Sequence, residues 1–130
     1  MRRSTLAHAL GIWGPVVLYV GMIFYLSSQS KIPWAARYPD WIEHPVEYAG
    51  LAVLMARALN DGLRRPFRPG LILRAFLLCV ACGIADECWQ WFTPDRMSDV
   101  RDVINDSIGS GLALVALVLG RRLLAGRRVA

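Results

Sequence analysis

The apolar residues of this chain fall into four blocks, and a polar connection separates each block from the next. A helix that spans a membrane needs about 20 mostly apolar residues, a length that the first, third and fourth blocks reach. The pattern predicts an all-α polytopic membrane protein in which residues 1–130 form a single domain, a bundle of four transmembrane helices. The predicted helices occupy about residues 9–28, 44–60, 71–92 and 102–124.

The overall composition also favours a membrane protein. Hydrophobic residues make up 55% of the 130 positions and the mean hydropathy is +0.38, which is more apolar than most soluble domains. Arg2 and Arg3 precede the first block, as basic residues do in a secretory signal, but no Ala-x-Ala-like cleavage site follows it. We therefore expect the first block to remain as an uncleaved helix.

The charged residues divide unequally between the two sides of the predicted bundle. With the N-terminus in the cytoplasm, the cytoplasmic side holds eleven arginines and one acid, Asp61, whereas the outer side holds four basic and nine acidic residues. Short cytoplasmic loops are enriched in Lys and Arg, so we expect both termini to be cytoplasmic in a multi-pass protein of the bacterial inner membrane. The net charge of +5 then reflects topology and contact with anionic lipids, and does not indicate nucleic-acid binding.

The segment DECWQWFTPDRMSDVRDVINDSIG, residues 86–109, places six acids and two arginines between two apolar blocks. Asp86 follows Arg74 by twelve residues, about 18 Å along a helix, in the outer part of the bilayer, where charge must face protein or water. Polar residues here continue two stripes of small side chains, which mark close helix packing, so the acids should point into the bundle. The stripes are Ala75, Cys79, Cys82, Asp86 and Gln90, and Asp102, Asn105, Gly109, Ala113, Ala116 and Gly120.

The second and fourth predicted helices bring further polar residues to the same side. Pro45 suits the first turn of a helix, and His44 and Tyr48 share a face because they are four residues apart. Asp99 and Asp102 open the fourth helix, where carboxylates can cap free backbone amides. Polar groups of three helices are therefore expected to converge at one depth on the outer side.

At these residues the sequence resembles the VanZ-like family. The family's first signature, D-K-x-x-H-x-x-x-Y, corresponds to DWIEHPVEY, residues 40–48, in which Trp41 stands in place of the lysine. The second signature corresponds to the segment quoted above, and SSQS after the first helix is also similar. Residues in register with the second signature are Asp86, Glu87, Gln90, Phe92, Pro94, Arg96, Asp99, Asp102, Asn105 and Gly109.

The resemblance runs from the first predicted helix to the fourth and implies a membrane protein of the bacterial cell envelope. The family is named for a protein associated with resistance to teicoplanin-type glycopeptide antibiotics. It therefore implies an antibiotic-resistance phenotype in relatives and not a reaction, and it leaves open whether this chain is an enzyme.

The residues at the outer side have candidate roles in a functional site. Proton transfer suits His44, Asp86 and Glu87 as catalytic candidates, and a role as a metal ligand is the alternative for His44. For the acids, the alternative is that they form only a structural network between helices. The candidate contacts to a substrate or lipid headgroup are Tyr48, Gln90, Arg96, Asp99, Asp102 and Asn105.

Arginine pairing is the expected means of neutralising the acids. Arg96 and Arg101 supply two fixed positive charges in the same segment, so no metal and no cofactor is expected there. We expect Arg96 to be partly free to meet an anionic headgroup.

Three classes of function fit these features. The first is a protein that binds or acts on an envelope lipid or a polyprenyl-linked cell-wall precursor. The second is a non-catalytic accessory subunit that works through partners. The third is a small proton-coupled transporter, which we rank last because transport requires ionisable groups near the middle of the membrane, where the predicted helices are apolar.

Overall fold

The computed structural model describes residues 5–29, 39–64 and 66–126. These residues form four α-helices and no strand: α1 (Thr5–Ser27), α2 (Asp40–Leu59), α3 (Pro69–Trp91) and α4 (Val100–Gly126). The all-α prediction with four helices is confirmed. Several residues of the predicted charge pattern lie outside the described residues: Arg2, Arg3, Lys31, Arg37, Arg65, Arg127 and Arg128. The side chain of Asp40, the first residue of the DWIEHPVEY motif, is also not described.

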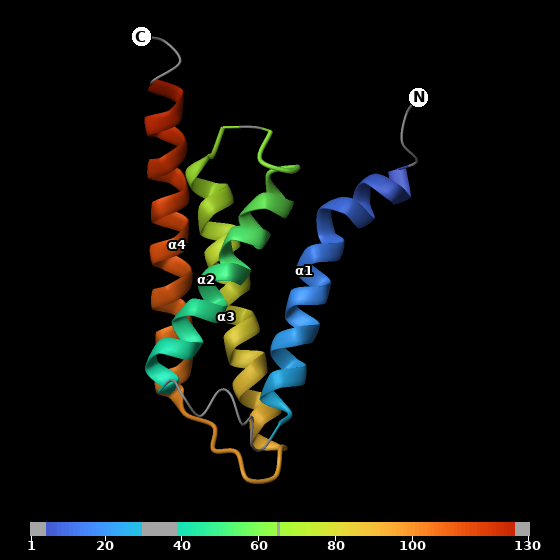
Figure 1. Ribbon diagram of the computed structural model, residues 1–130, viewed down its shortest axis with the longest axis vertical. Coiled ribbons are helices and arrows are strands. Elements are labelled where there is room, and N and C mark those ends of the chain that lie inside the picture. The colour runs from blue at the N-terminus through green and yellow to red at the C-terminus, as the bar shows by residue number, and fades with distance from the viewer. Residues whose placement is uncertain (1–4, 30–38, 65, 127–130) are drawn as a thin grey trace.

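The helices form an elongated bundle with two distinct ends (Figure 1). The start of α1 and the end of α4 lie at one end, which we call the terminal end. The connection between α3 and α4, residues 92–99, lies at the opposite end, which we call the loop end.

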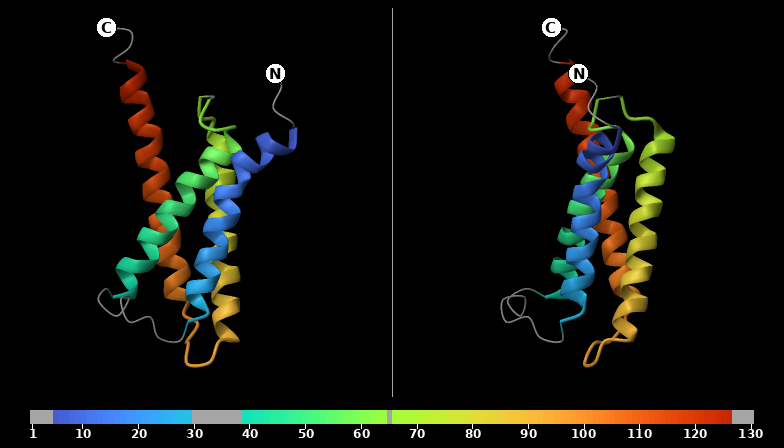
Figure 2. Two further views of the ribbon diagram at one scale, coloured as in Figure 1. Left: turned by 45° about the vertical axis from the view of Figure 1, so that its right-hand side comes forward. Right: turned by 90° about the vertical axis from the view of Figure 1, so that its right-hand side faces the viewer.

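Helices α2 and α3 each contact the other three helices, and the most extensive contact in the bundle is between α2 and α4. The left view of Figure 2 shows α2 crossing between α4 and α1. Its buried residues Leu51, Ala52 and Met55 pack with Ile23 of α1 and Leu114 of α4 in the apolar core. Burial of these side chains supplies the packing contacts that hold the bundle together.

Helix α2 begins at Asp40, four residues before the predicted start. The Pro39 carbonyl accepts hydrogen bonds from the backbone amides of Ile42 (2.8 Å) and Glu43 (3.3 Å), which starts the helix early. Pro45, predicted in the first turn, consequently lies inside the helix. That prediction is wrong by about one turn.

Glycine 109 brings α2 and α4 into close contact. A Cβ atom at this position would overlap the backbone carbonyl oxygen of Pro45. No side chain larger than hydrogen fits there, and the two backbones therefore approach each other as small residues allow in membrane helix pairs.

The bundle is apolar outside and polar at several points inside. Large apolar side chains are exposed along α1 and α4, among them Leu18, Leu112 and Leu123, whereas Asp86 and Asp106 are buried. A soluble protein of this size rarely exposes apolar surface so extensively. The arrangement fits contact with lipid tails instead.

Two of the four helices are long and apolar enough to cross a membrane on length and composition alone. These are α1 over Leu6–Ser27 and α4 over Val100–Ala125, among the residues that were described. Helices α2 and α3 are not among the helices that meet this criterion. The fold therefore supports two crossings directly and leaves four as a proposal.

Helix α1 bends near Pro15, and its first turns lean away from the bundle in Figure 1. Proline has no N–H to donate to the carbonyl four residues earlier, that of Gly11. In its place Arg57 of α2 donates Nη2 to the Gly11 carbonyl and Nη1 to the Ile12 carbonyl, each at 3.3 Å. The arginine thus satisfies backbone groups at the bend.

Candidate functional site

Each of the four helices contributes polar side chains to one region at the loop end. Six of these residues are at most 5% exposed: Ser27, Tyr48, Asp86, Glu87, Gln90 and Asp106. Charge buried at this depth is costly unless it has partners, so its concentration here is the main feature of the interior. We call the following residues the polar cluster: Ser27, His44, Tyr48, Asp86, Glu87, Gln90, Asp102 and Asp106.

His44 of α2 lies between two carboxylates of α4. Its Nδ1 is 3.1 Å from Oδ1 of Asp106, and its Nε2 is 3.8 Å from Oδ2 of Asp102. An ionised carboxylate can only accept a hydrogen bond, so an ionised Asp106 assigns the proton to Nδ1. The Nε2 atom is then the ring nitrogen able to exchange a proton, which is the usual arrangement of a histidine held by a carboxylate.

Asp86 of α3 joins α3 to α1. Its Oδ2 accepts a hydrogen bond from Ser27 Oγ at 2.9 Å and a second from Gln90 Nε2 at 3.3 Å. Both groups donate to the same oxygen. The other oxygen, Oδ1, is buried without a hydrogen-bond partner among the described residues.

Glu87, the next residue of α3, holds the start of α4. Its Oε2 accepts a hydrogen bond from the backbone amide of Asp99 at 2.8 Å. The Asp99 carboxylate in turn accepts from the amide of Arg101 at 2.9 Å, which is the capping role predicted for it. Glu87 therefore fixes the geometry of the connection through one oxygen and has its second, Oε1, buried and unbonded within the described structure.

Four buried polar atoms of the cluster lack a hydrogen-bond partner among the described residues: Tyr48 Oη, Asp86 Oδ1, Glu87 Oε1 and Asp106 Oδ2. Most buried polar groups in proteins are hydrogen-bonded. Each unsatisfied group costs about 1–3 kcal/mol or more. Their gathering in one place requires an explanation, and a ligand that supplies donors is one.

Gly83 makes room for two of these groups. A Cβ atom at Gly83 would lie 3.0 Å from Oδ2 of Asp106 and 3.6 Å from Cε1 of Tyr48. The tyrosine ring and the carboxylate thus share the space beside α3, where a larger residue would displace them. Ser110 closes this region by donating Oγ to the Tyr48 carbonyl at 3.4 Å.

The predicted arginine pairing is not among the ion pairs described at the loop end. Those pairs are formed by His44, whereas Arg96 donates a hydrogen bond from Nε to the Ser27 carbonyl oxygen at 3.4 Å. Arg101 is exposed. His44, which was a catalytic candidate, is the cation-forming group nearest to the acids in the described structure.

The predicted packing stripes are partly correct. On α3 the buried positions include Ala75, Cys79, Asp86 and Gln90 as expected, and Cys82 is partly buried. On α4 the buried face runs through Asp106, Gly109, Ser110 and Leu114, whereas Asp102 and Asn105 are partly buried and Ala116 is exposed. The prediction for Ala116 is wrong. The buried residues Asp106, Ser110 and Leu114 follow one another at intervals of four, and because a helix has 3.6 residues per turn, this row turns gradually around α4 and does not include Ala116.

Sequence reasoning missed three contributors to this region. Asp106 was counted only as an outer charge, although it lies four residues after Asp102 and so shares its face. Ser27 lies in the SSQS stretch, whose role was not assigned, and Ser110 follows the glycine of the close contact. All three carried a positional signal that could have been used.

The described cavities lie away from the polar cluster. Three cavities described along α3 and α4 have volumes of about 600, 500 and 490 Å³, and none of the three is lined by His44, Asp86 or Glu87. Among the described residues there is no group of three or more His, Cys, Asp or Glu side chains arranged to hold a metal ion. The cluster contains hydrogen-bonding and proton-exchange groups.

Comparison with known proteins identifies one match. A family model described as VanZ/LLP1 matches residues 21–121, a range that contains the whole polar cluster. Neither the comparison with proteins of curated function nor the comparison with solved structures gave a match.

Proposed function

Because the chain belongs to the VanZ/LLP1 family, we propose that it is a multi-pass protein of the bacterial cytoplasmic membrane with a polar site facing outward. The site binds the headgroup of an envelope lipid or of a polyprenyl-linked cell-wall precursor. The observation that carries this proposal is the set of four unbonded polar atoms in the polar cluster: Tyr48 Oη, Asp86 Oδ1, Glu87 Oε1 and Asp106 Oδ2.

The positions of the charges of α2 and α3 support four crossings. Asp86 and Glu87 are buried within the bundle, so these charges would not be exposed to lipid if α3 crossed the membrane. The charged residues of α2 include His44 and Glu47, which are partly buried at the loop end. The excess of arginine at the terminal end supports a cytoplasmic location for that end.

The chemistry of the unbonded atoms suits a headgroup rich in hydroxyl or amide donors. Carboxylate oxygens such as Asp86 Oδ1 and Glu87 Oε1 accept hydrogen bonds, and ionised acceptors bind donors strongly. Arg96, which is partly buried beside Ser27, supplies a guanidinium that can bind a phosphate in bidentate fashion. Sugars or peptides linked to a lipid phosphate combine both kinds of group.

His44 is the residue of the cluster best placed for proton transfer. Asp106 orients its ring through Nδ1, and Nε2 lies toward Asp102. If a headgroup hydroxyl lay at Nε2, this nitrogen would accept its proton and His44 would act as a general base. Binding is the core of the proposal, and proton transfer by His44 is its catalytic extension.

A transporter is less well supported than a binding site. Between the cluster and the terminal end the buried residues include Leu51, Met55, Ala75 and Leu114. A proton-coupled carrier needs ionisable or broken-helix positions along a path through the membrane. The apolar interior there offers no such path among these residues.

The direct test measures binding by thermal unfolding of the purified, detergent-solubilised protein. We expect a polyprenyl-diphosphate-linked saccharide to raise the melting temperature and phosphatidylcholine to leave it unchanged. Glu87→Gln and Arg96→Gln should remain helical by circular dichroism but lose the shift. Asp61→Asn at the terminal end is the control and should keep it.

A genetic test addresses the phenotype. A deletion strain should change in its envelope lipids or lipid-linked wall precursors, or in its sensitivity to teicoplanin-type antibiotics. Wild-type protein should restore the strain, and Glu87→Gln at equal membrane abundance should not. Restoration by Glu87→Gln, or the same thermal shift in wild type and both variants, would reject the outward-facing site.

A further inference from the structure

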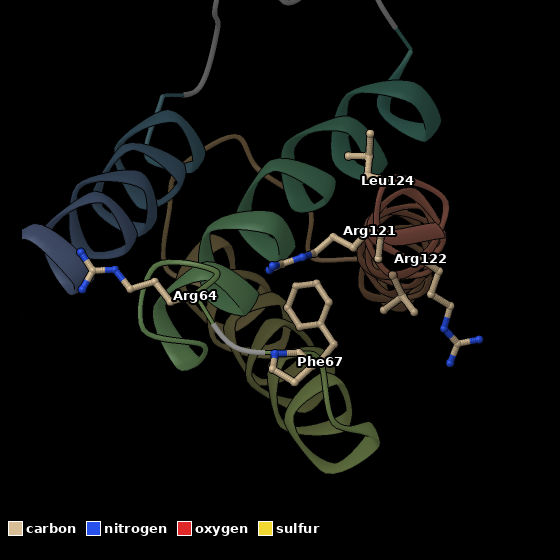
Figure 3. A pocket seen from close by; sticks show the side chains of 8 residues that line it. Arg64, Phe67, Arg121, Arg122 and Leu124 are labelled. Carbon is tan, nitrogen blue, oxygen red and sulfur yellow. The ribbon is translucent and has the colours of Figure 1, made fainter. Parts of the chain in front are cut away.

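A second candidate site lies at the terminal end, on the opposite side of the bundle from the polar cluster. A cavity of about 600 Å³ opens there between the connection from α2 to α3 and the last turns of α4 (Figure 3). Its described lining contains three arginines and no acid. The lining residues are Arg64, Pro66, Phe67, Val118, Arg121, Arg122, Leu124 and Ala125.

Arg121 is fixed in position at the centre of this cavity. Its Nη1 donates to the Leu63 carbonyl oxygen at 2.6 Å, and its Cζ lies 5.1 Å from the centre of the Phe67 ring. Stacking on an aromatic ring orients a guanidinium. A guanidinium has five N–H donors, so one bond to a carbonyl leaves others to bind an anion.

Arg64 and Arg122 flank Arg121. Figure 3 shows the Arg121 guanidinium beside the Phe67 ring, with Arg64 and Arg122 on opposite sides of it and their guanidinium groups directed outward. The side chains of Arg64 and Arg122 are exposed. One oriented cation with an exposed arginine on either side makes this opening strongly positive, which suits a phosphate group with its negative charge and several acceptor oxygens.

An apolar groove continues from this basic opening. A second cavity of about 500 Å³ shares Phe67, Val118 and Arg122 with the first and runs between α3 and α4. Its further lining is mainly apolar and includes Leu73, Phe76, Leu114, Val115 and Leu119. The groove thus runs from the arginines toward the middle of the bundle.

We propose that the two cavities together bind one anionic phospholipid. Its phosphate lies on Arg121 between Arg64 and Arg122, and one acyl chain follows the groove past Val118. A basic opening joined to an apolar groove matches a charged head and a hydrocarbon tail, and basic recesses between membrane helices on the cytoplasmic side are suited to such lipids. The location of this lipid in the cytoplasmic leaflet rests on the proposed topology, whereas the proposed binding site itself does not.

The test is lipid binding to the whole protein, measured by native mass spectrometry and thermal unfolding. Phosphatidylglycerol added to protein in a neutral detergent should give a bound adduct and a raised melting temperature, and phosphatidylcholine should not. Arg122→Gln should weaken phosphatidylglycerol binding by roughly tenfold, the loss expected for one charge-assisted contact of about 1.4 kcal/mol. Val118→Trp should weaken it too, with every charge retained, because Val118 lines both cavities and the larger indole would obstruct the passage between them.

Two control variants separate this site from other causes. Arg74→Gln removes the same charge from an exposed position of α3 that lines none of the three described cavities, and it should bind normally. Glu87→Gln in the polar cluster should also bind normally, so failure of the proposed headgroup site and failure of this one can be told apart.

Several results would overturn the proposal. If phosphatidylcholine bound as tightly as phosphatidylglycerol, the lipid charge would not contribute to binding. If Arg74→Gln weakened binding as much as Arg122→Gln, the lipid would be attracted to the positive surface as a whole. Stabilisation by inorganic phosphate to the same extent as by the lipid would identify a site for a free anion. Unchanged binding in Val118→Trp would exclude an acyl chain from the groove.

Discussion

Nδ1 of His44 lies 3.1 Å from Oδ1 of Asp106, although 62 positions separate the two residues in the chain. The contact depends on the close approach of α2 and α4 at Gly109, where only a hydrogen atom fits against the Pro45 carbonyl. Pro45 follows His44 directly, and Gly109 is one turn from Asp106. The glycine therefore sets the spacing of the histidine–carboxylate pair.

Gly109→Ala should destabilise the protein for this reason. The added Cβ overlaps the Pro45 carbonyl, and forcing a methyl group into a packed contact costs about 1–3 kcal/mol. We expect a lower melting temperature in detergent. The matched control is Gly120→Ala in the same helix, where a Cβ meets nothing within 4 Å. An equal loss of stability in both variants would contradict the role of the close contact.

Ser27→Ala should lower the stability of the protein, because the buried Asp86 carboxyl loses a hydrogen bond. The change removes the 2.9 Å hydrogen bond to Oδ2 and leaves the contact from Gln90 at 3.3 Å. A buried group that loses its partner costs about 1–3 kcal/mol. Chemical or thermal unfolding measures the change.

Ser107→Ala is the control for Ser27→Ala. Its hydroxyl bonds only locally, to the Val103 carbonyl four residues earlier in the same helix, and such back-bonding contributes little to helix stability. We expect a change of no more than about 0.5 kcal/mol. If the two serine variants lose equal stability, the link between α1 and α3 through Asp86 is unimportant.

Arg57→Gln should weaken α1 through the bend at Pro15. The arginine donates to the Gly11 and Ile12 carbonyls, and loss of these partly exposed bonds should cost about 1 kcal/mol. In a Pro15→Ala background the helix can bond the Gly11 carbonyl itself, so the same change should cost less. A double-mutant cycle from unfolding measurements checks the coupling, and additive effects would argue against it.

Reporter fusions test the proposed topology. Fusions after residue 65 and at the C-terminus should report a cytoplasmic location, whereas fusions near Pro39 and Asp95 should report an external one. The physical basis is the excess of arginine at the terminal end. A cytoplasmic signal at Asp95 would place the polar cluster on the other side of the membrane.

Sequence reasoning succeeded where periodic patterns decide the structure. Apolar blocks of helical length identified the four helices, and the polar continuation of small-residue stripes indicated that Asp86 and Gln90 point inward, as they do. Asp99 was predicted to cap α4, and its side chain bonds the Arg101 amide. These features depend on local spacing along a single helix.

The partners of the buried acids were harder to predict because they depend on how helices cross. Arginine was favoured on charge and proximity in sequence, whereas the described carboxylate partners are His44, Ser27 and Gln90. The crossing at Gly109 rotates α4 so that Asp106 meets His44. A single sequence does not specify that rotation.

The origin of the polar cluster in all four helices has a consequence for biosynthesis. Ser27, His44, Asp86 and Asp106 become available in chain order, so α4, the last helix made, supplies the carboxylate that orients His44. Until it arrives, Glu87 lacks the Asp99 amide and His44 lacks both of its acids. Under the proposed four-crossing topology, the first three helices would carry these unmatched polar groups in the membrane until the fourth helix is inserted.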